Sequence, residues 1–80
     1  METGLLWFDN DAARSIEEKV RRAAEHYRAR HGHTCDVCFV PPAVLADNEP
    51  LQVDGVQVRA GRAILPHHFW LGVLEEMLNE

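Results

Sequence analysis

No apolar stretch of this 80-residue sequence approaches the roughly 20 residues that a membrane-spanning helix needs. The apolar run over residues 5–8 is too short for the hydrophobic region of a signal peptide, and no positive charge precedes it. Cysteine is scarce: Cys35 and Cys38 are the two in the chain, and they do not form the pattern of a secreted disulfide framework. These absences predict a cytoplasmic protein with free thiols and no membrane partner.

Basic residues are few, with 8 Lys and Arg against 13 Asp and Glu and a formal net charge of −5. After residue 32 only Arg59 and Arg62 are basic. Because affinity for nucleic acid rests largely on Lys and Arg contacts to phosphates, this balance argues against a nucleic-acid partner. A local exception is an arginine cluster, but acidic residues alternate with it, which predicts a solvated, salt-bridged helix face. The cluster comprises Arg14, Arg21, Arg22 and Arg28, and the interleaved acids are Glu17, Glu18 and Glu25.

The sequence is 46% hydrophobic, which is too apolar for a disordered chain and sufficient for a small core. We therefore expect a single domain over residues 1–80. A core this thin gains stability from a partner or from a second copy of the chain.

The clearest element is a helix expected over residues 15–31. Ser15 and Glu18 have the spacing of a capping box, in which each side chain accepts from an exposed backbone N–H near the helix start. Gly32 is typical of a residue that ends a helix in the left-handed conformation. One apolar stripe runs along the predicted helix through Ile16, Val20, Ala23, Ala24 and Tyr27.

Strands are expected on both sides of this helix. The apolar runs at residues 5–8 and 36–40 predict two buried strands, which the helix would join in a right-handed β-α-β unit with parallel strands. Residues 42–47 are expected to form a helical turn. Alternating residues around Asp54-Gly55 predict a hairpin over residues 51–58 with a type I′ turn. That turn would place four apolar side chains on one face: Leu51, Val53, Val56 and Val58.

The C-terminal region fits either a strand or a helix. Gly72 weakens a helix interior, so we favour a strand over residues 68–73, followed by a short helical or frayed tail over residues 74–80. The predicted fold is a small α/β (α+β) domain, in which one long helix packs on a four- or five-stranded mixed sheet.

Asp9 and Asp11 directly follow the first predicted strand. Two carboxylates at a strand end could bind a divalent metal or a phosphate-bearing ligand, with His67 or His68 as a further ligand or general base. No nucleophile motif accompanies these residues. The structural alternative is that Asp9 and Asp11 end the strand and lead into the helix, while one histidine at the edge of the core bonds to the backbone and the other is exposed.

Zinc binding through Cys35 and Cys38, with His31 and His33 upstream, is a third hypothesis. On a strand, residues three apart point to opposite faces, so the two thiols are not expected to reach one metal. Cys38 is expected to be a small core residue, and we expect no cofactor.

Aromatic residues give the most economical functional signal. Trp7, Phe69 and Trp70 lie on apolar runs, and the small interior favours exposure of at least one tryptophan beside apolar neighbours. We therefore expect a non-enzymatic accessory protein that binds a protein partner, or a second copy of itself, through a patch formed by Trp70, Phe69, Trp7 and the hairpin.

Three segments carry a resemblance. The residues Leu5 to Asp11, Cys38 to Pro42 and Ile64 to Val73, in particular the sequence ILPHHFWLGV, resemble a family of short, uncharacterised bacterial proteins. The resemblance implies a self-contained single domain and supplies no activity, cofactor or binding residue.

Overall fold

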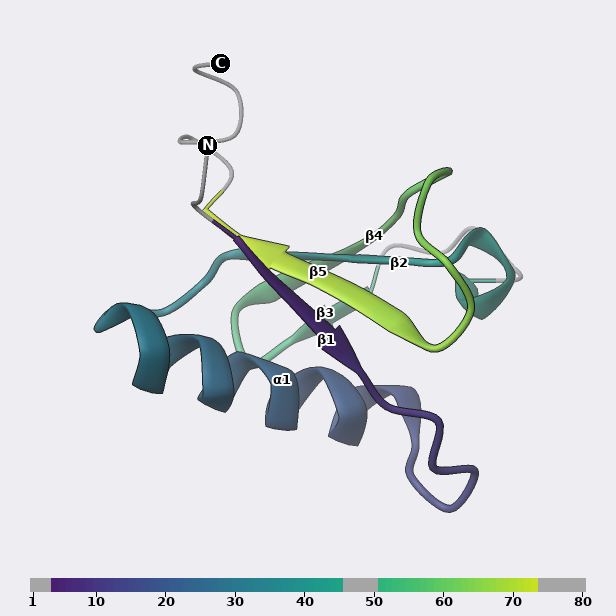
Figure 1. Cartoon of the computed structure of the whole chain (residues 1–80), viewed down its shortest axis with the longest axis horizontal. Helices are drawn as coiled ribbons and strands as arrows, with labels where there is room; N and C mark the ends of the chain where they lie inside the picture. Colours follow the sequence, from purple (N-terminus) through teal and green to yellow (C-terminus); the bar gives the residue numbers. More distant parts are fainter. Residues whose placement is uncertain (1–3, 46–50, 74–80) are drawn as a thin grey trace.

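A computed structural model describes residues 4–45 and 51–73. Within these residues the chain forms one helix, α1 (Ile16–His31), a 3-10 turn, η1 (Pro42–Leu45), and five strands. The strands are β1 (Leu5–Phe8), β2 (Val37–Val40), β3 (Leu51–Val53), β4 (Val56–Ala60) and β5 (His68–Gly72). They form one mixed sheet in the order β1-β5-β2-β4-β3, and α1 lies along one face of it (Figure 1). The predicted α+β fold with one long helix on a mixed sheet is confirmed, with five strands. No helix in the described ranges is long and apolar enough to cross a bilayer.

The helix begins and ends as its sequence predicts. The Ser15 hydroxyl accepts a hydrogen bond from the Glu18 backbone N–H at 3.1 Å. Gly32 has a φ of 81°, and its N–H donates to the Arg28 carbonyl at 2.9 Å. Of the predicted stripe, Val20, Ala23 and Tyr27 are buried, and Ile16 and Ala24 pack against the core as partly buried side chains.

The hairpin also agrees with its prediction. Asp54 and Gly55 both have positive φ, 51° and 85°, as a type I′ turn requires. The register pairs Leu51 with Val58 and Val53 with Val56, and these side chains face the core. Arg21 of α1 donates from Nε to Asp54 Oδ2 at 2.8 Å, so an ion pair joins the helix to the hairpin turn.

The β-α-β unit differs from its prediction in one respect. β1 and β2 are both antiparallel to β5 and are therefore parallel to each other, as expected, but β5 lies between them. β1 is consequently at the edge of the sheet. The prediction of a buried first strand is wrong, because Leu6 and Phe8 are 57% and 53% exposed. An apolar run identifies a strand but not its place in the sheet.

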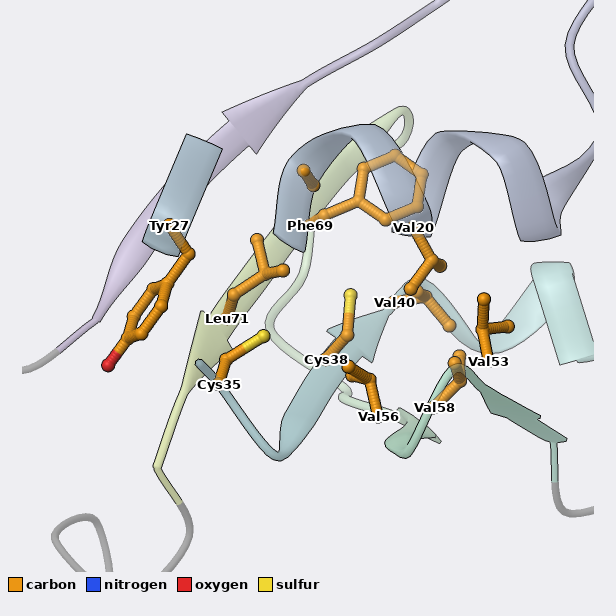
Figure 2. Close-up of a cluster of buried hydrophobic side chains, with 11 residues drawn as sticks. Val20, Tyr27, Cys35, Cys38, Val40, Val53, Val56, Val58, Phe69 and Leu71 are labelled. Atoms are coloured by element: carbon orange, nitrogen blue, oxygen red, sulfur yellow. The ribbon is translucent and has the colours of Figure 1, made fainter. Parts of the chain in front are cut away.

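The core lies between α1 and the sheet (Figure 2). It contains side chains from α1 and from strands β2 to β5, together with Cys35. The second strand is buried as predicted, and residues 68–72 of the predicted C-terminal strand form β5. The helical turn predicted over residues 42–47 corresponds to η1 at Pro42–Leu45. Residues 46 and 47 of that prediction, and the predicted tail at 74–80, lie outside the described residues.

Candidate interaction surface

The face of the sheet opposite α1 carries a row of side chains that crosses four strands. We call this face the open face, because in the described part of the chain no helix lies over it. The register places Leu6 of β1 opposite Trp70 of β5, and Trp70 opposite Phe39 of β2. Phe39 in turn pairs with Arg59 of β4. Leu6, Trp70, Phe39 and Arg59 thus form one continuous line, which we call the aromatic row.

Alternation along each strand explains why these side chains face away from the helix. In β2, Cys38 and Val40 are buried in the core, whereas Phe39 between them is partly exposed. In β5, Phe69 and Leu71 are buried in the core and Trp70 is partly exposed. The apolar part of the row is therefore reachable from solvent on β1, β5 and β2.

Two glycines, Gly4 and Gly61, allow the backbone to approach side chains of the aromatic row closely. A methyl group at Gly4 would lie 2.6 Å from Cε2 of Trp70, so the indole lies directly against the Gly4 backbone. A methyl group at Gly61 would lie 3.3 Å from Cβ of Phe39 and 2.9 Å from Ile64. The connection between β4 and β5 therefore borders the open face next to Phe39.

Phe8 continues the apolar surface beside the row. Its ring centroid lies 5.0 Å from that of His68 and 6.3 Å from that of His67. His68 Nδ1 lies 2.8 Å from the Pro66 carbonyl oxygen, and His67 has a positive φ of 66°. The backbone bond of His68 and the exposure of His67 match the structural alternative predicted for this pair, but His68 lies on the open face against Phe8 and not at the edge of the core.

The border of the open face is basic. Arg59 donates from Nε and from a terminal nitrogen to Gln57 Oε1, at 3.2 Å and 2.8 Å, which holds its guanidinium along the sheet. Arg62 is exposed in the connection between β4 and β5. This connection, residues 61–67, contains no Asp or Glu. In the described strands, no open-face position is occupied by Asp or Glu. In the described strands the face is therefore apolar with two arginines on its β4 side, although the whole chain is acidic.

The residues predicted for an aromatic patch fall in three different places. Trp70 lies on the open face. Phe69 is 2% exposed and belongs to the core, so its predicted place in an exposed patch is wrong. The apolar hairpin side chains also face the core, and the hairpin presents Gln52 and Gln57 instead.

Trp7 lies on the helix side of β1. Its ring lies against that of His26 with a centroid distance of 4.2 Å and a tilt of 30°, in a shallow pocket of about 380 Å³. Its indole Nε1 is buried without a hydrogen-bond partner. Leu5, Ala29 and Arg30 complete the pocket lining. Trp7 and Trp70 therefore do not share a surface.

Asp9 and Asp11 are held together by one cation. An Arg14 terminal nitrogen lies 3.3 Å from Asp9 Oδ1 and 3.1 Å from Asp11 Oδ2. The Asp11 backbone N–H donates to Asp9 Oδ1 at 3.0 Å, and the Ala13 N–H donates to Asp11 Oδ1 at 2.9 Å. These bonds form the connection from β1 to α1, as the structural alternative predicted.

The Asp9 carboxylate is stabilised in its charged form. Burial alone would raise the pKa of Asp9, but the Asp11 N–H and the charges of Arg14 and Lys19 outweigh it and lower the pKa. Asp9 is also separated from His68 by the strand alternation, because His68 packs on Phe8 at the open face.

The two thiols lie on the same side of the sheet, contrary to the expectation that they point to opposite faces. Cys35 precedes β2, so strand alternation does not apply to it, and both thiols belong to the core cluster (Figure 2). Burial raises the pKa of Cys35, and it raises the pKa of Cys38 to about 12. Thiols that stay protonated are poor nucleophiles.

The nearby histidines pack on an aromatic ring. His31 stacks on Tyr27 at 4.3 Å, and His33 meets the same ring edge-on at 5.5 Å. His31 Nε2 is buried without a hydrogen-bond partner. Among the residues that the structure describes, no three His, Cys, Asp or Glu side chains are grouped as metal ligands.

Sequence reasoning missed four residues of the open face: Leu6, Phe8, Phe39 and Arg59. Alternation within residues 36–40 could have separated Phe39 from Cys38 and Val40, but the exposure of Leu6 and Phe8 depends on β1 being an edge strand. No protein-family model, curated protein or solved structure matches this chain.

Proposed function

We propose that this protein is a small, non-enzymatic accessory protein that binds another protein through the open face of its sheet. The observation that carries the proposal is the apolar part of the aromatic row together with Phe8, a surface that no described helix or strand covers and that extends across three adjacent strands. Contiguous exposed apolar surface bordered by polar residues is typical of protein interaction sites. Partly buried aromatic side chains at its centre supply the anchor residues that dominate binding energy.

The charge of the margin defines the partner. Arg59 and Arg62 border the face, and no acid occupies it in the described strands. A partner with an apolar patch flanked by Asp or Glu would place opposite charges together, which favours association and excludes basic surfaces. We therefore propose an acid-bordered apolar protein surface as the partner.

The compartment proposed is the cytoplasm. Cys35 and Cys38 are both free and buried, which is compatible with a reducing environment. Acid quenching of intact cells, followed by alkylation under denaturing conditions and mass analysis, tests this directly. Two reduced thiols are expected, and a disulfide in the freshly extracted protein would contradict the proposal.

The binding test compares matched surface substitutions. A protein retained from native cell extract by the immobilised chain is purified, and its affinity is measured by calorimetry. Phe8→Ser removes an apolar side chain of the open face, whereas Val44→Ser removes one that is 38% exposed on η1. We expect Phe8→Ser to weaken binding at least about tenfold, within the range of an interface anchor. Val44→Ser is expected to bind as wild type does.

Arg59→Glu tests the charge of the partner. It should slow association, most strongly at low salt, because the positive charge of Arg59 attracts the acidic border of the partner during diffusional encounter. Equal affinities for Phe8→Ser and Val44→Ser would contradict the open-face proposal. An unchanged association rate for Arg59→Glu would contradict the acidic border.

A further inference from the structure

Among the described residues, none pairs with the outer edge of β1, where two residues direct their backbone groups outward. The Asp9 N–H donates to the His67 carbonyl at 3.0 Å, which continues the β1–β5 ladder by one pair. In an antiparallel ladder, hydrogen-bonded pairs alternate with pairs that exchange no bonds. The pairs of Trp7 and Leu5 with β5 are therefore bonded, so Leu6 and Phe8 direct their N–H and C=O groups to the outer edge.

Leu6 and Phe8 are also the two most exposed residues of β1, at 57% and 53%. Each of them thus combines an unpaired backbone edge with an apolar side chain on the open face. β1 contains neither a charged residue nor a proline. Proteins commonly block edge strands with such residues, and a strand that lacks them is a template for another strand.

The second edge of the sheet is less suitable for pairing. β3 has three residues, and Gln52 at its centre is polar and exposed. Its turn is bound to α1 through the Arg21–Asp54 ion pair. The pairing edge of the molecule is therefore β1.

We infer that two copies of this chain pair antiparallel through β1, about a twofold axis at Trp7. In this register Leu6 faces Phe8 of the second copy and Phe8 faces its Leu6. Both outward-directed residues then exchange both N–H···O bonds with the opposite strand. The register follows because it is the one in which every outward residue of β1 meets an outward residue of the same strand.

The side chains of an identical strand fit this arrangement. β1 is uncharged, so twofold pairing brings no like charges together. On the open face Leu6 lies beside Phe8 of the second copy, which joins the apolar parts of the two faces. The inference rests on backbone geometry and so does not depend on the proposed function, although it would double the docking surface.

Two substitutions at Leu6 distinguish the contribution of its backbone N–H to dimerisation from that of its side chain. Leu6→Pro removes an outward N–H without removing a β1–β5 bond, and edge strands accept proline with the N–H side facing solvent. Leu6→Ala removes most of the same side chain and keeps the N–H. Analytical ultracentrifugation over a concentration series should show a wild-type dimer, a modestly weaker dimer for Leu6→Ala and a monomer for Leu6→Pro. A wild-type monomer, or equal dimerisation of the two variants, would overturn the inference.

Cross-linking tests the register without proline. Backbone positions in a bonded antiparallel pair are about 5.5 Å apart, within disulfide range. A mixture of Leu6→Cys and Phe8→Cys should form the mixed disulfide dimer faster than either variant forms its own. Faster cross-linking of either variant alone would exclude pairing about Trp7. Loss of partner binding by Leu6→Ala with dimerisation retained would separate this inference from the proposed function.

Discussion

Gly4 supports the indole of Trp70 at the point where the chain enters β1. An added methyl group there would lie 2.6 Å from Cε2 of the indole and 3.0 Å from the Leu71 carbonyl oxygen. The first distance is shorter than real contacts of a Cβ atom, and the second is tighter than most of them. The position of Trp70 on the open face therefore depends on a hydrogen atom at residue 4.

Gly4→Ala should displace the Trp70 ring and destabilise the fold by about 1–3 kcal/mol, as overpacking does. The indole N–H resonance of Trp70 should shift, and denaturant unfolding should give the stability change. Gly32→Ala is the control, because no atom lies within 4 Å of the added methyl and its cost comes from the φ of 81° alone. An unmoved indole resonance in Gly4→Ala would contradict the close contact.

The Asp9–Arg14 pair should make stability depend on acid pH. The pKa of Asp9 is lowered in the folded state, so its contribution is present above the ordinary pKa of 3.8 and is lost as pH falls through the folded value. Asp9→Asn should lower the free energy of unfolding at pH 7 by about 1–3 kcal/mol.

Denaturant titrations between pH 7 and pH 3 measure this effect. The free energy of unfolding of the wild type should fall more steeply towards pH 3 than that of Asp9→Asn. Glu17→Gln removes an exposed carboxylate and controls for the loss of one negative charge. If the free energies of unfolding of wild type and Asp9→Asn depend on pH in the same way, the pKa of Asp9 is not lowered by its partners in the folded state.

Neighbouring aromatic residues in β5 should respond differently to truncation. Phe69 is buried against α1 and Trp70 is partly exposed on the other face. Phe69→Ala should cost about 3–5 kcal/mol, enough to unfold much of a small domain. Trp70→Ala should cost less and instead weaken partner binding. Thermal unfolding ranks the two variants, and a Trp70→Ala less stable than Phe69→Ala would reverse their assigned faces.

The thiols should be slow to react while the chain is folded. Because the pKa of Cys38 is raised to about 12 and that of Cys35 is also raised, little thiolate forms near pH 8. A thiol-reactive dye should therefore label neither residue appreciably in the native protein and both in denaturant. Rapid stoichiometric labelling in native buffer would contradict their burial.

Local signals predicted the elements whose contacts are close in sequence. The Ser15 cap, the Gly32 end and the Asp54-Gly55 turn each depend on a few adjacent residues, and all three agree with the structure. The stripe on α1 likewise follows from helical spacing alone.

Long-range pairing determined what the sequence did not reveal. Alternation assigns Phe69 and Trp70 to opposite faces of a strand, but which one is inward depends on how β5 pairs with β1 and β2. The same pairing places β1 at the edge and exposes Leu6 and Phe8. Cys35 was misplaced for a different reason, because β2 begins two residues after it.

The central position of β5 has a consequence for synthesis. β1 and β2 both pair with β5, whose residues are translated after both of them. A nascent chain can form α1 and the β3–β4 hairpin before β5 is made. β1 cannot join the rest of the sheet until residue 72 has emerged from the ribosome, because β5 lies between β1 and β2. Until then the apolar stripe of the helix is available to chaperones and proteases.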